Sequence, residues 1–339
     1  MEYRTLGRTG LKVSCVGFGG IPLAGLTVEE AGKVLNRALD LGINFIDTAR
    51  GYKESESLIG STISKRRKEF YLATKTRARD EEGILKEYGI SSEYLKTDYF
   101  DLYQIHYVNT EEELELVMKP GGPYDVLYRL RDEGKIGYIG ITGHDASVLM
   151  IAAKTGKFDT IQGAFSFLEK EQKIVDLIHF CEENNIGFIC QKPLAGGAIV
   201  NGVAGLKWIL HFPVSTVIPG MSNVEQVEQN VAAGSPPFDL STDEMNALDE
   251  IASKLDKYFC RRCYYCHPVC PENIRIGVIL EFYGKAQFPE NLQLARRWYQ
   301  GFKINAANCT ECGLCLPECP YGLPIIDMLK EAHALLGVQ

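Results

Sequence analysis

Eight of the eleven cysteines fall in two short windows of identical spacing. The windows run from Cys260 to Pro271 and from Cys309 to Pro320, and both read Cys-x2-Cys-x2-Cys-x3-Cys-Pro. Three thiolates two residues apart can wrap one tight loop around the irons of a cubane cluster. Zinc is the simpler alternative, because a four-cysteine zinc site needs only two Cys-x2-Cys pairs. The third cysteine and the closing Cys-Pro are surplus to that need, so the pattern favours iron–sulfur chemistry.

This spacing resembles that of bacterial two-cluster ferredoxins, in which the fourth cysteine of a window binds the other cluster. The resemblance implies two [4Fe-4S] clusters with crossed ligand sets. One set is Cys260, Cys263, Cys266 and Cys319, and the other is Cys309, Cys312, Cys315 and Cys270. The segment between the windows has helical patterns at Ile274–Lys285 and Glu290–Gly301, as in helical dicluster ferredoxins. The three other cysteines, Cys15, Cys181 and Cys190, are expected to be buried apolar residues.

Four polar residues stand at or just beyond the ends of apolar, strand-like runs. Asp47 ends Phe-Ile-Asp, Tyr52 follows it, Lys75 ends Ala-Thr-Lys, and His106 ends Gln-Ile-His. Each alone has an ordinary structural explanation, such as a helix cap for the aspartate or a core position for the histidine. Together, at the carboxyl ends of parallel strands, a carboxylate, a phenol, an ammonium and an imidazole are equipped for acid–base chemistry.

From Tyr3 to Leu255 the chain resembles the aldo-keto reductase family, which has an Asp-Tyr-Lys-His tetrad. The matching segments are residues 4–11, 42–49, 98–106, 192–197 and 218–220. The resemblance implies reduction of a carbonyl compound by a nicotinamide nucleotide, or the reverse oxidation of an alcohol. A barrel of this family followed by ferredoxin cysteines also resembles a known prokaryotic subgroup.

The resemblance also implies a role for each tetrad residue. Tyr52 is expected to act as general acid or base, with Lys75 lowering its pKa from the ordinary value of about 10. Asp47 is expected to hold Lys75 charged and aimed at Tyr52. His106 is expected to orient the carbonyl group and to stabilise the developing oxyanion.

The cofactor positions match the family less closely. Thr142 and Gln162 match residues that read the nicotinamide carboxamide, whereas Gly143 replaces the usual Asn and His144 is expected to compensate. Gln191 stands where many members stack a Tyr on the nicotinamide, so stacking is expected to be weaker. The pyrophosphate is assigned to Lys192, Gly196 and Gly197, although a Gly-Gly pair is also common in simple turns.

At the adenine end, the family match assigns Gly220, Ser222, Gln226 and Asn230 to the nucleotide. Many members carry a Lys and an Arg here that clamp the 2′-phosphate of NADP, but this chain has neither between Lys207 and Lys254. An NADP phosphate would therefore lack its usual cations. We expect NADH to be used at least as well as NADPH.

The elements that position these residues alternate between strands and helices. The pattern predicts eight strands: 13–19, 45–49, 71–76, 101–107, 137–142, 160–165, 187–193 and 216–220. Helical patterns lie between most of them, which predicts an α/β fold of the (β/α)8 TIM-barrel type. A doubly wound sheet is the alternative, but no Gly-x-Gly-x-x-Gly follows the first strand. Strand patterns stop near residue 256, so the predicted domains are a barrel over 1–256 and a small, mainly helical ferredoxin-like domain over 257–339.

Composition sets the broad class of the protein. The net charge of −8 argues against a nucleic-acid partner. No apolar run of membrane-spanning length occurs, and the first residues lack the apolar stretch of a signal peptide, so a cytoplasmic location is expected. Clustered cysteines in that compartment favour metal over disulfides.

The joint role of the two domains stays open at the level of sequence. In the first hypothesis the barrel is a conventional reductase of small carbonyl compounds, and the clusters are structural or dock a partner. In the second, the clusters relay electrons to or from a ferredoxin-like or flavoprotein partner, which requires a one-to-two-electron converter because a hydride carries two electrons. In the third, the chain is a non-catalytic redox-sensing module, which the intact tetrad disfavours.

Overall fold

The computed structural model describes residues 1–255, 259–261, 265–319 and 321–338. The chain folds into two compact units, Met1–Met245 and Asn246–Gln339. Each unit has its own hydrophobic core. The predicted boundary at 256/257 falls within residues 256–258, which lie outside the described part of the chain, and it stays a prediction.

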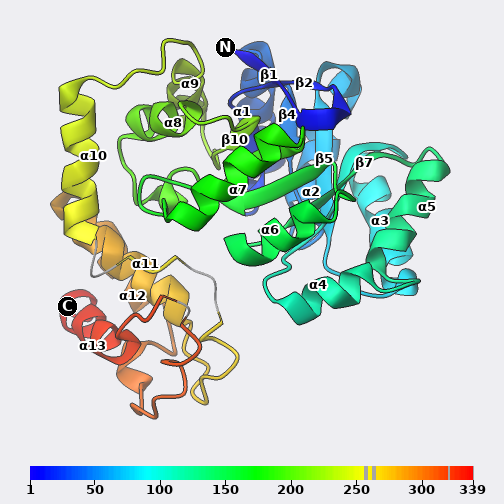
Figure 1. Cartoon of the computed structure of the whole chain (residues 1–339). Coiled ribbons are helices and arrows are strands. Elements are labelled where there is room, and N and C mark those ends of the chain that lie inside the picture. The colour runs from blue at the N-terminus through cyan, green and yellow to red at the C-terminus, as the bar shows by residue number, and fades with distance from the viewer. Residues whose placement is uncertain (256–258, 262–264, 320, 339) are drawn as a thin grey trace. The chain divides into compact units, whose positions relative to one another are not determined.

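The first unit is a barrel of parallel strands (Figure 1). The strands, in hydrogen-bonded order, are β3 (Phe18–Gly19), β4 (Phe45–Asp47), β5 (Tyr71–Thr76), β6 (Phe100–Ile105), β7 (Ile136–Thr142), β8 (Thr160–Ala164), β9 (Gly187–Gln191) and β10 (Thr216–Ile218). Two isolated parallel bridges, Val16 to Val217 and Gly19 to Gly220, join the two edges of the sheet. This closure confirms the predicted (β/α)8 architecture.

Helices follow the strands and cover the outside of the barrel. They are α1 (Val28–Asp40), α2 (Ser55–Thr62), α3 (Glu81–Leu95), α4 (Glu111–Met118), α5 (Pro123–Asp132), α6 (Ala146–Lys154), α7 (Gln172–Glu183), α8 (Gly202–Leu210) and α9 (Val224–Ala232). The next helix, α10 (Thr242–Leu255), begins in the first unit and continues into the second. Side-chain caps fix the first residues of several helices. Thr27 and Glu30 form a capping box at α1, and the Asn223 side chain accepts from Gln226 N at α9.

The predicted first strand, 13–19, is divided in the structure. Lys12–Ser14 is β2, which pairs antiparallel with β1 (Tyr3–Thr5), and only residues from Val16 onward join the barrel. The hairpin inserts Leu6 and Val13 into the barrel interior, where they form a cluster with Phe45, Leu102 and Ile189. A continuous apolar run cannot show this change of partner, because both parts are equally buried.

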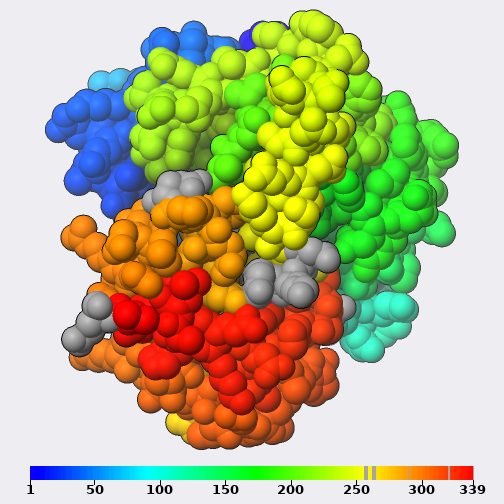
Figure 2. All heavy atoms as spheres, turned by 90° about the vertical axis from the view of Figure 1, so that its left-hand side faces the viewer, coloured from blue at the N-terminus to red at the C-terminus, as the bar shows by residue number. Residues whose placement is uncertain are grey.

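The second unit is helical, as predicted. Its helices after α10 are α11 (Ile276–Ala286), α12 (Leu292–Gln300) and α13 (Ile325–Leu336). Figure 2 shows α11 and α13, in orange and red, as parts of one close-packed body, and α11 packs against both α12 and α13. No helix in the described part of the chain is long and apolar enough to cross a membrane.

Candidate active site and cysteine-lined cavities

A buried ion pair lies at the carboxyl end of the barrel strands. Lys75 Nζ, near the end of β5, donates to Asp47 Oδ1 on β4 at 2.5 Å and to the Thr48 carbonyl at 2.8 Å. The Gln104 side chain on β6 donates to Asp47 Oδ2 at 3.2 Å. Lys75 and Asp47 are 1% exposed, so each charge depends on the other. Gln104 is a supporting residue that the strand-end pattern does not single out, because it precedes the end of its strand.

Tyr52 and His106 complete the group at this end of the barrel. Lys75 Nζ lies 5.0 Å from the centroid of the Tyr52 ring, and the Tyr52 and His106 ring centroids are 5.7 Å apart, edge to face. Tyr52 stands in the loop between β4 and α2, and His106 directly follows β6. The structure thus brings together the four residues that the sequence singles out.

Burial and charge set the protonation states of the group. Burial raises the pKa of the Tyr52 phenol above its ordinary value, and the charge of Lys75 opposes that rise without reversing it. Lys75 therefore acts in the predicted direction, although it does not bring the pKa of Tyr52 below 10. Burial pulls the pKa of Lys75 down, but Asp47 and Tyr52 together raise it above its usual value. The pKa of His106 lies well below 6.5 because of burial first and then the charges of Lys75 and Arg77.

A second buried carboxylate fixes the loop that carries Tyr52. Glu56 on α2 forms an ion pair with Arg50 and accepts hydrogen bonds from Thr74 Oγ1 at 2.6 Å and Ser91 Oγ at 2.8 Å. Its side chain has no exposed surface. Because Arg50 and Glu56 bracket Tyr52 in sequence, their contact closes the loop around it.

The predicted carboxamide readers are Thr142, the last residue of β7, and Gln162, in the middle of β8. Both polar side-chain atoms of Gln162 are buried and form no hydrogen bond of good geometry with a described residue, although the Gln162 amide helps to lower the pKa of Asp47. Such a buried amide is expected to bind a ligand. Thr142 Oγ1 instead accepts from Tyr107 N at 3.1 Å, and Gln191 Nε2 donates to the Gly143 carbonyl at 2.8 Å. These two residues brace neighbouring loops.

The structure gives a steric reason for Gly143. A Cβ at this position would lie 2.2 Å from the Val108 carbonyl oxygen, so the usual Asn does not fit. The next residue of that passing loop, Asn109, accepts from His144 N at 2.6 Å, and its Nδ2 is buried with no partner in the described part of the chain. An amide is therefore present beside His144, but it comes from another loop, which a residue-by-residue match cannot find.

The predicted phosphate and adenine positions follow β9 and β10. Lys192, Ala195, Gly196 and Gly197 all have positive φ, between 48° and 93°, so the chain makes a tight turn here that suits the two glycines. Beyond Gly220, Ser222 N donates to Gln226 Oε1 at 2.8 Å. Asn230 is buried on α9, and the first turn of this helix carries an acidic residue, Glu225.

The described cysteines of the second unit line two cavities. Cys270, Cys309, Cys312 and Cys315 line one, and Cys260, Cys266 and Cys319 line the other. These are the two predicted ligand sets, except that Cys263 lies outside the described residues. All seven thiols are free of disulfides, and apolar side chains including Ile276 and Leu329, or Leu280 and Ile325, form the rest of the walls.

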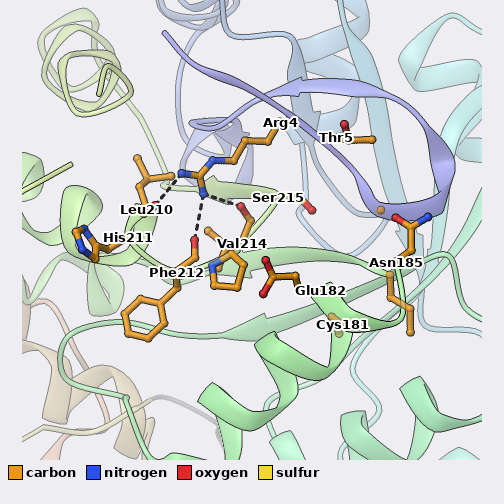
Figure 3. A pocket seen from close by; sticks show the side chains of 13 residues that line it. Arg4, Thr5, Cys181, Glu182, Asn185, Leu210, His211, Phe212, Val214 and Ser215 are labelled. Atoms are coloured by element: carbon orange, nitrogen blue, oxygen red, sulfur yellow. Dashed lines mark hydrogen bonds between the residues drawn. The ribbon is translucent and has the colours of Figure 1, made fainter. Parts of the chain in front are cut away.

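A larger cavity of about 500 Å³ lies at the opposite, amino end of the barrel strands (Figure 3). Its most prominent polar group is Arg4, whose guanidinium donates to the carbonyls of Leu210, Phe212 and Val214. Since these bonds and an ion pair with Glu2 occupy the guanidinium, it stabilises the loop before β10. None of the four strand-end residues lines this cavity, so its size does not make it the active site.

Comparison with known proteins agrees with this geometry. Residues 15–204 and 200–253 match the aldo/keto reductase family, and residues 259–323 match a 4Fe-4S dicluster domain. The chain belongs to the aldo/keto reductase family, and it is an oxidoreductase with a 4Fe-4S domain at its C-terminal side. The family implies small carbonyl or alcohol substrates.

Individual relatives cover the barrel. The chain is 28% identical over 306 residues to the L-galactose dehydrogenase of Arabidopsis thaliana, covering 76% of this chain and 95% of that protein. It is 31% identical over 207 residues to an aldo-keto reductase of Schizosaccharomyces pombe named for NADP(+), covering 55% and 59%. An aldo-keto reductase from Bacillus halodurans, in its holo form, superposes with a TM-score of 0.63 at 25% identity, over 74% of this chain and 96% of that one.

Proposed function

We propose that the barrel interconverts a carbonyl compound and an alcohol with a nicotinamide nucleotide, using Tyr52 as general acid and base. The observation that carries this proposal is the buried Lys75, which is bonded to Asp47 and lies beside the Tyr52 ring with His106 opposite. A lysine and an aspartate held in this way have little structural purpose at a strand end, because burying an ion pair seldom adds stability.

In this proposal each residue has one task. When bound, the nicotinamide supplies the hydride for the carbonyl carbon. Neutral His106 donates a hydrogen bond to the carbonyl oxygen, which suits a pKa well below 6.5. Tyr52 donates its phenolic proton to that oxygen as negative charge develops there, and Lys75 offsets the phenolate that remains. Asp47 keeps Lys75 charged and fixed through the 2.5 Å contact.

The residues present fit a nicotinamide nucleotide. Gln162, with its buried amide, is the strongest candidate for the carboxamide, and we add Asn109 to the predicted Thr142 and His144. We assign Lys192, Gly196 and Gly197 to the pyrophosphate, with Gln191 bracing the loop. Gly220, Ser222, Gln226 and Asn230 remain our candidates for the adenosine end. The yeast relative's name supports a nicotinamide nucleotide as the cofactor class.

The nucleotide preference provides the test. Since the sequence offers no Lys or Arg between Lys207 and Lys254, and α9 begins with Glu225, we expect kcat/KM for NADH to equal or exceed that for NADPH. Initial rates with either nucleotide, measured with a panel of aldehydes and ketones, test both the proposed carbonyl reaction and the nucleotide preference. Nucleotide oxidation independent of every carbonyl would contradict the proposed reaction, whereas a large advantage for NADPH would contradict only the preference.

We also propose that the cysteine-lined cavities hold two [4Fe-4S] clusters, with Cys260, Cys263, Cys266 and Cys319 as ligands of one and Cys270, Cys309, Cys312 and Cys315 as ligands of the other. The donor set fits, because thiols and apolar groups make up most of each wall, beside a few polar residues such as Glu272 in one cavity and Arg261 and Glu318 in the other. Among the described residues, no three His, Cys, Asp or Glu side chains are close enough to hold one metal ion. Thiols that surround a cavity without converging on a point suit a cluster better than a zinc ion.

We assign these clusters first to a structural or partner-docking role. Electron relay is the second candidate, and the exposure of Cys312 favours it, because a cluster bound there would lie near the surface of its unit. A ferredoxin-like or flavoprotein partner could then approach it. We further propose a cytoplasmic location, in which such thiols stay reduced.

A further inference from the structure

An exposed arginine lies near the candidate active site. Arg77 follows Lys75 by two residues, just beyond the end of β5, and its side chain is exposed. Its guanidinium carbon lies 4.8 Å from the centroid of the Tyr107 ring. That ring in turn lies 6.5 Å from the His106 ring and 5.4 Å from the His144 ring, both edge to face. Arg77 therefore borders the space beside His106.

The Tyr107 ring is a fixed platform for this cation. Tyr107 has a φ of 67°, which a non-glycine residue adopts only when its surroundings impose it. Its N–H donates to Thr142 Oγ1 at 3.1 Å, and its carbonyl accepts from Arg79 Nη2 at 3.2 Å. Arg79 also donates to the His106 carbonyl at 2.7 Å. These hydrogen bonds use the Arg79 guanidinium and fix the backbone of His106 and Tyr107.

Arg77 itself is not occupied in this way. In the described part of the chain its guanidinium forms no ion pair and no hydrogen bond, although its backbone N–H donates to Glu87. Glu87 accepts from Thr76 Oγ1 at 2.6 Å through the same oxygen. The charge of Arg77 still reaches the site, since it helps to lower the pKa of His106 and opposes the rise in that of Tyr52.

We propose that Arg77 binds a carboxylate of the substrate, so that the preferred substrates are oxo acids or the corresponding hydroxy acids. This inference rests on the proposed carbonyl chemistry and names its substrate class. The planar guanidinium matches a carboxylate with two parallel hydrogen bonds, and the Tyr107 face keeps it oriented. One guanidinium can satisfy a carboxylate, whereas a phosphate usually draws several donors. Because Tyr107 separates Arg77 from His106, the carboxylate lies several bonds from the reacting carbonyl.

The test compares charged and uncharged aldehydes of equal chain length. The pairs are succinic semialdehyde with butanal, glutaric semialdehyde with pentanal, and adipic semialdehyde with hexanal. We expect kcat/KM to be higher for the charged member of at least one pair, and Arg77→Gln to lower that charged-to-uncharged ratio by about tenfold to a hundredfold. The ratio is the proper readout because removing the charge of Arg77 also alters the electrostatic field at Tyr52 and His106. That change affects the charged and the uncharged aldehyde of a pair alike.

Two further variants make the result specific. Arg77→Lys should recover part of the charged-to-uncharged ratio, mainly by lowering KM for the charged aldehyde. Lysine keeps the positive charge but cannot form the two parallel hydrogen bonds of a guanidinium. Arg129→Gln removes the same charge from the outer helix α5, where Arg129 is 55% exposed and paired with Glu81, and should leave the ratio unchanged. The inference would be overturned if the wild-type charged-to-uncharged ratio of kcat/KM is near one, or if Arg77→Gln does not lower this ratio. In either case uncharged aldehydes would still react, so the proposed function would stand. If no aldehyde of either kind oxidises the nucleotide, the proposed function itself fails.

Discussion

Replacing Tyr52 with Phe is expected to lower kcat for carbonyl reduction by about a hundredfold to ten-thousandfold, the range for loss of a positioned general acid. The variant keeps the ring that packs 5.7 Å from His106 and 5.0 Å from Lys75 Nζ, so the change removes only the proton donor. Steady-state rates with the best aldehyde of the panel measure the effect. Nucleotide affinity, followed by fluorescence titration, should change little.

The pH profile separates this role from a structural one. Burial raises the pKa of Tyr52, so the wild-type phenol stays protonated from neutral pH upward to beyond its ordinary value of about 10. Reduction should therefore persist into alkaline solution, whereas alcohol oxidation should rise with pH. Tyr128→Phe, on an exposed ring of α5, is the matched control and should leave kcat unchanged. Equal rates for Tyr52→Phe and wild type would assign the barrel a non-catalytic role.

The second large effect is expected from Cys315→Ala. Cys315 is 7% exposed and lines one cavity together with Cys270, Cys309 and Cys312. Loss of this ligand should remove about half of the bound iron and sulfide if each cavity holds one cluster. The helical unit should also unfold more readily, because ligand binding contributes directly to its folding free energy. Iron analysis and thermal unfolding of anaerobically reconstituted protein measure both effects.

Cys181→Ala is the control for this experiment. Cys181 is buried in α7 of the barrel, and burial raises the pKa of its thiol to about 12, so it is an inert core residue. Its replacement should leave the iron content unchanged. Full iron content in Cys315→Ala would contradict the assignment of Cys315 as a cluster ligand, and zinc bound in place of iron would contradict the cluster itself.

The sequence predicts most of the barrel because its strands are buried on both faces and read as apolar runs between helical patterns. The tetrad positions follow from the same patterns, since parallel strands end on one side of the barrel. The cysteine sets also lie together in the structure, where Cys270 lines a cavity with Cys309, Cys312 and Cys315. Local spacing and strand direction carry this information.

What the sequence does not predict depends on contacts between distant loops. The close approach of Val108 to Gly143 brings Asn109 beside His144, and no local pattern signals it. The platform of Tyr107 under Arg77 depends on a positive φ that tertiary hydrogen bonds impose. The raised pKa of Tyr52 also could not be predicted from the sequence. Burial of the phenol outweighs the charge of Lys75, and the degree of burial depends on the fold.

The most direct test of the central claim follows hydride and clusters in one experiment. Anaerobically reconstituted protein receives NADH deuterated at the transferable position and then a reactive aldehyde, while visible absorbance reports the clusters. We predict that deuterium appears on the carbinol carbon of the alcohol, that NADH is consumed only with aldehyde, and that cluster absorbance stays constant. Bleaching of the clusters by NADH with recovery on adding aldehyde, and an alcohol without deuterium, would contradict direct transfer in the barrel and support electron relay.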